Sequence, residues 1–414
     1  MNVIARSFDV ARPSAESEGL RGLDATNFIL AAMLAGFGPF VAVFLGSLDW
    51  SQRDIGLVLS IGFVAALVAQ LPGGELLDIV RSKRLLIALG AIMLAVAALI
   101  VALWPTFAPV AIALVLQGVT GAIASTAIAA ISLGLVGHAA LAERLGRNQS
   151  FRSAGSLAAA ALFGVLGYAF TDRAIFFATA VVAIPMLLAL AHIPGGAIHF
   201  GRSVGAPDWP APSKPARATR RSLSKHRQLL VFAACLFLFQ MADAAILPLV
   251  GGTLAHREGS RSVPIMSALV VTPQILVVLL APWTGRYAQR HGRRTLLLLG
   301  FAALPLRALL FGLNPDPILL IAAQLLDGLS GTALGVLTPL IIADLTMGTG
   351  RYNLAQGLVG TISALGAAVS TAVSGYLASR FGTGIAFLEI LATAAAGTVA
   401  LWLLMPETKP PRHR

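Results

Sequence analysis

The chain has 414 residues, of which 57% are hydrophobic and 12% are charged, and its formal net charge is +12. Soluble domains usually carry about 25% charged residues, so this composition excludes an ordinary water-facing surface and makes a lipid bilayer the expected solvent. In that solvent the positive charge indicates basic loops at one membrane face rather than nucleic-acid binding. The single cysteine, Cys235, excludes an internal disulfide framework and a CxxC metal site.

Long apolar runs follow one another from residue 26 onward. We expect no cleavable signal in the polar segment before them. A helix needs about 20 apolar residues to cross a bilayer core of about 30 Å, and these runs are continuous rather than alternating, which argues against barrel strands. The predicted fold class is therefore an all-α integral membrane protein with twelve transmembrane helices. They are expected at residues 26–48, 55–74, 85–104, 107–136, 149–170, 174–193, 229–252, 264–284, 295–313, 318–345, 354–379 and 385–405.

The longest loop, residues 194–228, contains five prolines and a basic cluster. We interpret it as a linker between two six-helix bundles, residues 26–193 and 229–405, with tails at residues 1–25 and 406–414. The cluster either anchors the orientation of the chain or binds anionic membrane lipids. It consists of Arg217, Arg220, Arg221, Lys225 and Arg227.

Basic residues alternate sharply between the two faces of this arrangement. Of the 30 Lys and Arg, 24 fall on the face that holds the two termini, 5 fall on the opposite face, and Arg307 falls inside a helix. The positive-inside rule then predicts that both termini are cytoplasmic, with the chain in the plasma (inner) membrane.

The two halves carry the same loop. "GELLDIVRSKRLL" at residues 74–86 and "GRYAQRHGRRTLL" at residues 285–297 begin at glycines 211 positions apart. In addition, Gln117-Gly118-x-x-Gly121 matches Asp327-Gly328-x-x-Gly331 at an offset of 210. With six helices in each half, these matches indicate a parallel repeat about an axis along the membrane normal.

With these loops the sequence resembles the major facilitator superfamily, whose loop reads approximately G-x-L-x-D-R-x-G-R-R. The resemblance implies alternating access through a central cavity lined by helices 1, 4, 7 and 10. It also implies a conformational latch that holds the outward-open state, with Asp78 as its acid; the alternative is a solvated loop acid. The second copy has Gln289 in place of the acid. The matching latch residues are Gly74, Asp78, Arg84, Gly285, Arg290 and Arg294, of which Arg84 and Arg294 are candidates to contact the acid while the cations mainly set topology.

Charged residues within the expected helices are candidates for coupling or substrate contact. Asp243 and Asp327 fall well inside helices 7 and 10, where an ionised Asp costs about 2.5–3.5 kcal/mol on insertion scales. Arg307 lies at a depth similar to that of Asp327, so a structural ion pair is the competing interpretation, whereas Asp243 has no evident cation at its level. Asn27, Gln117 and Gln240 are neutral candidates on cavity helices, with hydrogen bonding between helices as the alternative.

Polar residues near the helix ends have plainer interpretations. Arg147-Asn148-Gln149, continued by Arg152, and Arg351-Tyr352-Asn353 are expected to open helices 5 and 11 as interfacial caps, with gate hydrogen bonds as the alternative. Asp344 and Glu389 are expected to reach water near helix ends.

These features favour a secondary transporter of a small solute, with efflux of an amphipathic or drug-like compound as the first hypothesis. Proton coupling stays open, because Leu114 stands where many drug/proton antiporters carry an Arg before the Gln-Gly pair. The alternative is an uptake symporter or uniporter, and a non-transporting receptor or scaffold has no supporting domain. We expect no enzyme activity, cofactor, metal or nucleic-acid partner. The expected partners are the solute, protons as a candidate coupling ion, and membrane lipids, with the chain acting as a monomer.

Overall fold

The computed structural model describes residues 15–37, 39–50, 52–206, 227–250, 262–313 and 316–409, and all regular structure in these ranges is helical. The linker prolines after residue 206 and the basic cluster up to Lys225 lie outside the described residues, as do residues 1–14 and 410–414. The all-α fold predicted from composition is confirmed.

The first half holds the elements from α1 to α8, and each expected span falls on one or two of its helices. Helix α1 begins earlier than the expected start at residue 26. The elements are α1 (Ala15–Ala35), α2 (Pro39–Ser47), α3 (Gln52–Ile79), α4 (Lys83–Leu103), α5 (Phe107–Ala169), α6 (Asp172–Val181), α7 (Ala183–Ala191), the 3-10 turn η1 (Gly195–Ala197) and the short α8 (Phe200–Ser203).

Helix α5 corrects one expectation about the first half. The loop expected between residues 136 and 149 is helical, and the only interruption in α5 is Gly137, whose φ of 64° no other residue adopts readily. Arg147, Asn148 and Gln149 therefore lie within a continuous helix and do not open a new one.

The second half repeats this plan. Its helices are α10 (Arg227–Asp243), α12 (Ser262–His291), α13 (Arg294–Leu313), α14 (Pro317–Leu345), α15 (Tyr352–Phe381) and α16 (Thr383–Leu404). Across the described residues, ten helical segments are long and apolar enough to cross a membrane, and one of them, Phe107–Phe163, has 57 residues, enough for two crossings.

The first helix of each half is interrupted at corresponding positions along the internal repeat. Helix α1 ends at Ala35 and α2 begins at Pro39, while α10 ends at Asp243 and the chain is helical again at residues 246–250. Discontinuous helices of this kind expose backbone groups near the bilayer midplane, where transporters place their sites.

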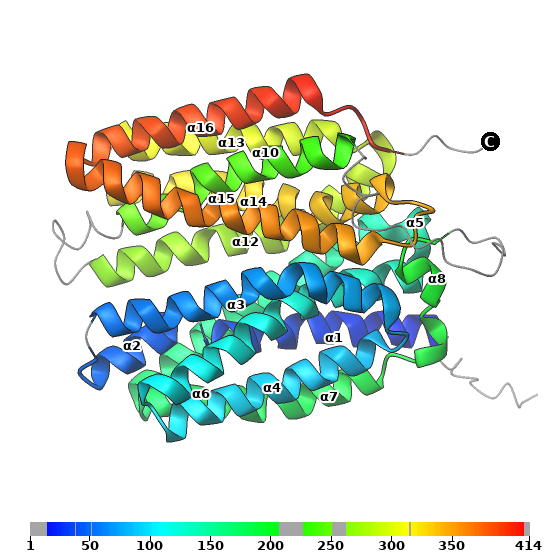
Figure 1. Ribbon diagram of the computed structural model, residues 1–414, viewed down its shortest axis with the longest axis horizontal. Coiled ribbons are helices and arrows are strands. Elements are labelled where there is room, and N and C mark those ends of the chain that lie inside the picture. The colour runs from blue at the N-terminus through cyan, green and yellow to red at the C-terminus, as the bar shows by residue number, and fades with distance from the viewer. Residues whose placement is uncertain are drawn as a thin grey trace, which may run out of the picture.

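The two halves lie side by side, with α10 to α16 above α1 to α7 in Figure 1 and the C-terminal end at the right. The outer faces carry large exposed apolar side chains, such as Leu403 at 65% and Ile318 at 79% exposure, which suit contact with lipid. We call the end that holds the two repeated loops the loop end. Here α5 of the first half packs against α12, and α3 packs against α15.

Candidate functional site

The two halves approach most closely at the loop end through glycines. A Cβ atom at Gly74 would collide with the backbone oxygen of Asn353, and one at Gly357 would collide with that of Gln70. An equivalent pair of contacts joins the halves between α12 and α5. Gly285 faces the Ala142 oxygen, and Gly146 faces that of Ala281. Every residue in the second pair is offset by 211 from its counterpart in the first, so the contact follows the internal repeat.

Asp78 joins the halves at this end. It lies at the end of α3, is 8% exposed, and accepts hydrogen bonds from the Asn353 backbone N at 3.2 Å, the Asn353 Nδ2 at 2.9 Å and the Leu354 backbone N at 3.1 Å. These N–H groups begin α15, so the carboxylate caps a helix of the other half and lies at its positive end. The geometry excludes the solvated loop acid that was the alternative interpretation.

The second loop has a weaker bridge. Gln289 donates from Nε2 to the backbone oxygen of Ala139 in α5, which is one neutral hydrogen bond to the first half. Asp78 therefore makes three hydrogen bonds to the other half, whereas Gln289 makes one.

Two of the expected latch cations act elsewhere. Arg84 donates to the oxygen of Ile193, just after α7, and Arg294 donates to the oxygen of Trp402 in α16 at 2.6 Å, so each joins its loop to another part of its own half. Neither contacts the acid of the latch, which corrects that expectation; the reason is that each Arg begins its helix beside the end of the last one. Arg290 is exposed and contributes its backbone oxygen, which accepts from Lys409 at 2.6 Å.

Glu407 from the C-terminal segment fixes the second loop. Its carboxylate accepts the backbone N–H groups of Arg293 and Arg294, which begin α13, and of Thr408 and Lys409. Burial alone would raise the pKa of Glu407. The four hydrogen bonds lower it by more than burial raises it, so the pKa lies below its ordinary value.

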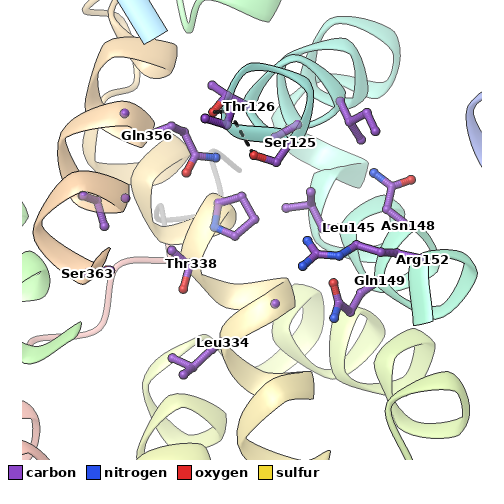
Figure 2. Close-up of a pocket in the computed structure, with 18 of the residues that line it drawn as sticks. Ser125, Thr126, Leu145, Asn148, Gln149, Arg152, Leu334, Thr338, Gln356 and Ser363 are labelled. Carbon is purple, nitrogen blue, oxygen red and sulfur yellow. Dashed lines mark hydrogen bonds between the residues drawn. The ribbon is translucent and has the colours of Figure 1, made fainter. Parts of the chain in front are cut away.

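A central cavity opens behind this closed end. One part, of about 310 Å³, lies between the halves and is lined by residues of α1, α3, α5, α14 and α15. A second part, of about 890 Å³, adjoins it within the first half. Asn27, Gln70 and Arg152 line both parts. Figure 2 shows Asn148, Gln149 and Arg152 on one side of the smaller part, across from Gln356 and Thr338.

Arg152 is the main revision of the sequence analysis. It was expected to extend an interfacial cap at the start of helix 5, yet it lies inside α5, and its side chain is exposed to the cavity. Of the neutral candidates, Asn27 and Gln117 line the cavity, whereas Gln240 lines neither part. Asn27 Nδ2 also donates to the Leu23 oxygen at 2.8 Å.

The charged candidates of the second half form one cluster. Arg307 Nη1 donates to Asp243 Oδ1 at 2.6 Å and to Asp327 Oδ1 at 2.7 Å. The expectation that Asp243 has no cation at its level was wrong, because the end of α10 brings its carboxylate against α13 and α14. The Arg307 side chain is 2% exposed, the two carboxylates are 27% and 25% exposed, and the three charges sum to −1. None of the three lines the cavity.

Other buried polar groups were not anticipated from the sequence. Asp24 forms ion pairs with Arg144 at 2.5 Å and with Arg147 at 2.7 Å, which join α1 to the part of α5 that follows the kink at Gly137. Arg293 binds Asp344 at 3.0 Å, with both side chains under 5% exposed, so Asp344 does not reach water as expected. Glu389, which is half-buried, accepts from Ser374 and Thr393, each at 3.0 Å. Only the occurrence of charges next to apolar runs pointed to these networks.

Comparison with known proteins gives a consistent result. A family model described as Major Facilitator Superfamily matches residues 23–259 and 235–414. An uncharacterized MFS-type transporter of Mycobacterium tuberculosis (strains CDC 1551 / Oshkosh and H37Rv) is 38% identical over 392 residues, which cover 94% of this chain and 93% of the relative. Multidrug resistance protein 2 of Bacillus subtilis (strain 168) is 23% identical over 192 residues, 46% of each chain.

A solved structure shares the fold at low identity. The proton:xylose symporter XylE, bound to 6-bromo-6-deoxy-D-glucose, superimposes with a TM-score of 0.70 and 14% identity. The match covers 95% of this chain and 97% of that one, so the likeness extends over both halves.

Proposed function

Since the chain belongs to the major facilitator superfamily and is thus an integral membrane protein of a secondary-transporter family, we propose that it exports a small amphipathic solute by alternating access. The observation that carries the proposal is a cavity of about 890 Å³ with a largely apolar lining, next to a part shared by both halves that is closed at the loop end. Such a lining suits an amphipathic body, because apolar surface removed from water contributes most of the affinity. The partial likeness to a multidrug resistance protein supports the efflux direction.

Closure at the loop end is the step that Asp78 controls in this proposal. Its hydrogen bonds to Asn353 and Leu354 exist only while α3 and α15 touch, so they favour the state that is open to the opposite side. With both termini in the cytoplasm of a cell whose plasma (inner) membrane holds the protein, this state faces outward. Opening of the loop end requires the cap on α15 to break.

The transport experiment uses membrane vesicles of both orientations. Inside-out and right-side-out vesicles are incubated with a mixed library of amphipathic acids, amides and amines, and the solutes that accumulate are measured by mass spectrometry. Efflux predicts protein-dependent accumulation in inside-out vesicles, strongly reduced by Asp78→Asn and little changed by Gln289→Ala. Accumulation only in right-side-out vesicles would instead support the uptake alternative, and no protein-dependent accumulation in either would contradict transport of such solutes.

We further propose that the cluster of Asp243, Arg307 and Asp327 couples transport to protons. One cation faces two carboxylates, so one proton on either carboxylate brings the cluster to neutrality, which lowers its cost within the membrane. The cluster also lies at the break of the first helix of the second half, where a change of charge can alter how α10 packs on α13 and α14.

Coupling is tested by imposing a pH gradient on vesicles that contain Asp243→Asn or Asp327→Asn. We expect flux to lose its dependence on the gradient while flux down a solute gradient persists. Glu389→Gln is the matched control, because Glu389 is also a carboxylate within the membrane but is held by two hydroxyl groups. Gradient-driven flux that is unchanged in both Asp variants would make the cluster a structural ion pair.

A further inference from the structure

Among the described residues that line either part of the cavity, Arg152 is the one with a charged side chain. It belongs to both linings, so it lies where the two parts meet. The described residues offer it no ion pair or hydrogen bond, and no carboxylate is among the residues that line either part.

Three buried arginines in the described ranges differ from it in this respect. Arg144, Arg293 and Arg307 are each at most 5% exposed, and each holds at least one carboxylate within 3.0 Å. A guanidinium at membrane depth is costly unless it is paired or faces a water-filled space. Arg152 faces the cavity instead of a carboxylate, so its guanidinium is available to a charged group of a solute that enters the cavity.

The other lining groups near Arg152 indicate which chemical groups the remainder of a bound solute would carry. Gln149 has its amide next to a cavity wall formed by Gly335, and Asn27, Gln70 and Gln356 add further amides to the lining. The larger part of the cavity presents an apolar wall on the other side. It is formed by Leu30, Leu34, Phe37, Leu59, Phe63 and Leu114.

We propose that the cavity binds an amphipathic organic monoanion, with a carboxylate on the guanidinium of Arg152 and its apolar body against the wall of the larger part. Arginine forms paired, charge-assisted hydrogen bonds with carboxylates, and these are stronger where water is scarce. One cation with no neighbouring acid balances one negative charge, and it repels amines. This inference rests on the proposed function and names the substrate class of the same cavity.

The direction of transport agrees with this charge. An inside-negative membrane potential drives a monoanion outward, so an exporter gains from it and an importer works against it.

The assignment is tested with sets of ligands that share a skeleton and differ in charge. 4-Phenylbutyrate, 4-phenylbutanamide and 4-phenylbutylamine form one set, and 1-naphthylacetate with its amide and amine forms a second. Binding to the purified full-length protein is screened by thermal shift and measured by calorimetry. We expect the carboxylates to bind and the amides and amines to bind far more weakly. Arg152→Gln should raise the Kd of the carboxylates roughly tenfold to a hundredfold, the loss expected for hydrogen bonds to a charged group.

Two further variants separate recognition from folding. Arg152→Lys keeps the charge without the paired geometry and should give an intermediate Kd. Arg380→Gln removes one positive charge at the exposed end of α15, outside both linings, and should leave the Kd unchanged. Equal binding by amides or amines, a Kd that Arg152→Gln does not change, or no carboxylate binding in either set would overturn the assignment.

Failure here is distinguishable from failure of the proposed function. If neutral or cationic solutes accumulate in inside-out vesicles and Asp78→Asn abolishes that accumulation, the protein is an exporter, but one without selectivity for anions. Absence of protein-dependent accumulation in inside-out vesicles would contradict the proposed export function itself.

Discussion

The cap that Asp78 places on α15 yields a prediction with a definite magnitude. In Asp78→Asn the side chain keeps one oxygen for Asn353, but an NH₂ group then faces the backbone N–H of Leu354, which donated to Oδ2 at 3.1 Å. The closed loop end therefore loses one hydrogen bond to a charged group, worth about 1.5–3 kcal/mol, together with the carboxylate at the helix start. This amounts to roughly a tenfold to hundredfold shift toward the state that is open at the loop end.

Labelling at a cavity position measures the shift. Thr338 lines the part of the cavity between the halves, so Thr338→Cys in inside-out vesicles should react with a membrane-impermeant maleimide only when the loop end opens. Cys235, the single native cysteine, is buried and is replaced by alanine to remove background. We expect Asp78→Asn to raise the labelling rate about tenfold or more.

Gln289→Ala provides the comparison in the same vesicles. It removes one neutral hydrogen bond, worth about 0.5–1.5 kcal/mol, and should raise the labelling rate far less than Asp78→Asn. Equal rates in the two variants, or a rate in Asp78→Asn equal to that of the parent, would refute the reasoning and leave the loops with a purely topological role.

Three further predictions concern stability and closure. Gly74→Ala should disfavour the closed loop end by about 1–3 kcal/mol through overpacking, whereas Gly375→Ala, which faces open space, should not; maleimide labelling compares them. Arg293→Ala should lower the free energy of unfolding in detergent by about 3–5 kcal/mol, because Asp344 stays buried, and the double variant with Asp344→Leu should recover part of that loss. Glu407→Gln should lower the melting temperature at neutral pH. Because the folded pKa of Glu407 lies below its ordinary value, the difference from the parent should disappear as the pH falls through that lowered pKa.

Controls for these variants use the same fold. A variant that elutes from size-exclusion chromatography at the same volume as the parent protein is folded, so any change in its behaviour is a local effect. A difference between Glu407→Gln and the parent that grows in acid would contradict the sign derived from its hydrogen bonds, and an unfolding free energy unchanged by Arg293→Ala would mean that the buried pair is not held in solution.

The amino-acid sequence alone determined the helical membrane fold and the internal repeat, and it singled out Asp78 as a candidate. These features depend on quantities that can be counted along the chain: apolar run lengths set by bilayer thickness, and residue types at a constant offset. The unequal pair Asp78 and Gln289 was visible in the same way, because the two loops can be aligned without knowing what they touch.

Only the tertiary structure decided which charges meet. Depth in the membrane follows from distance along a helix, but the direction in which a side chain points does not, because these helices are apolar on most sides and carry little amphipathic pattern. Asp243 therefore had no visible partner until α10, α13 and α14 brought it to Arg307. For the same reason Arg152 was counted with a basic loop. Only the structure showed that α5 continues beyond the kink at Gly137 and carries Arg152 on the cavity lining.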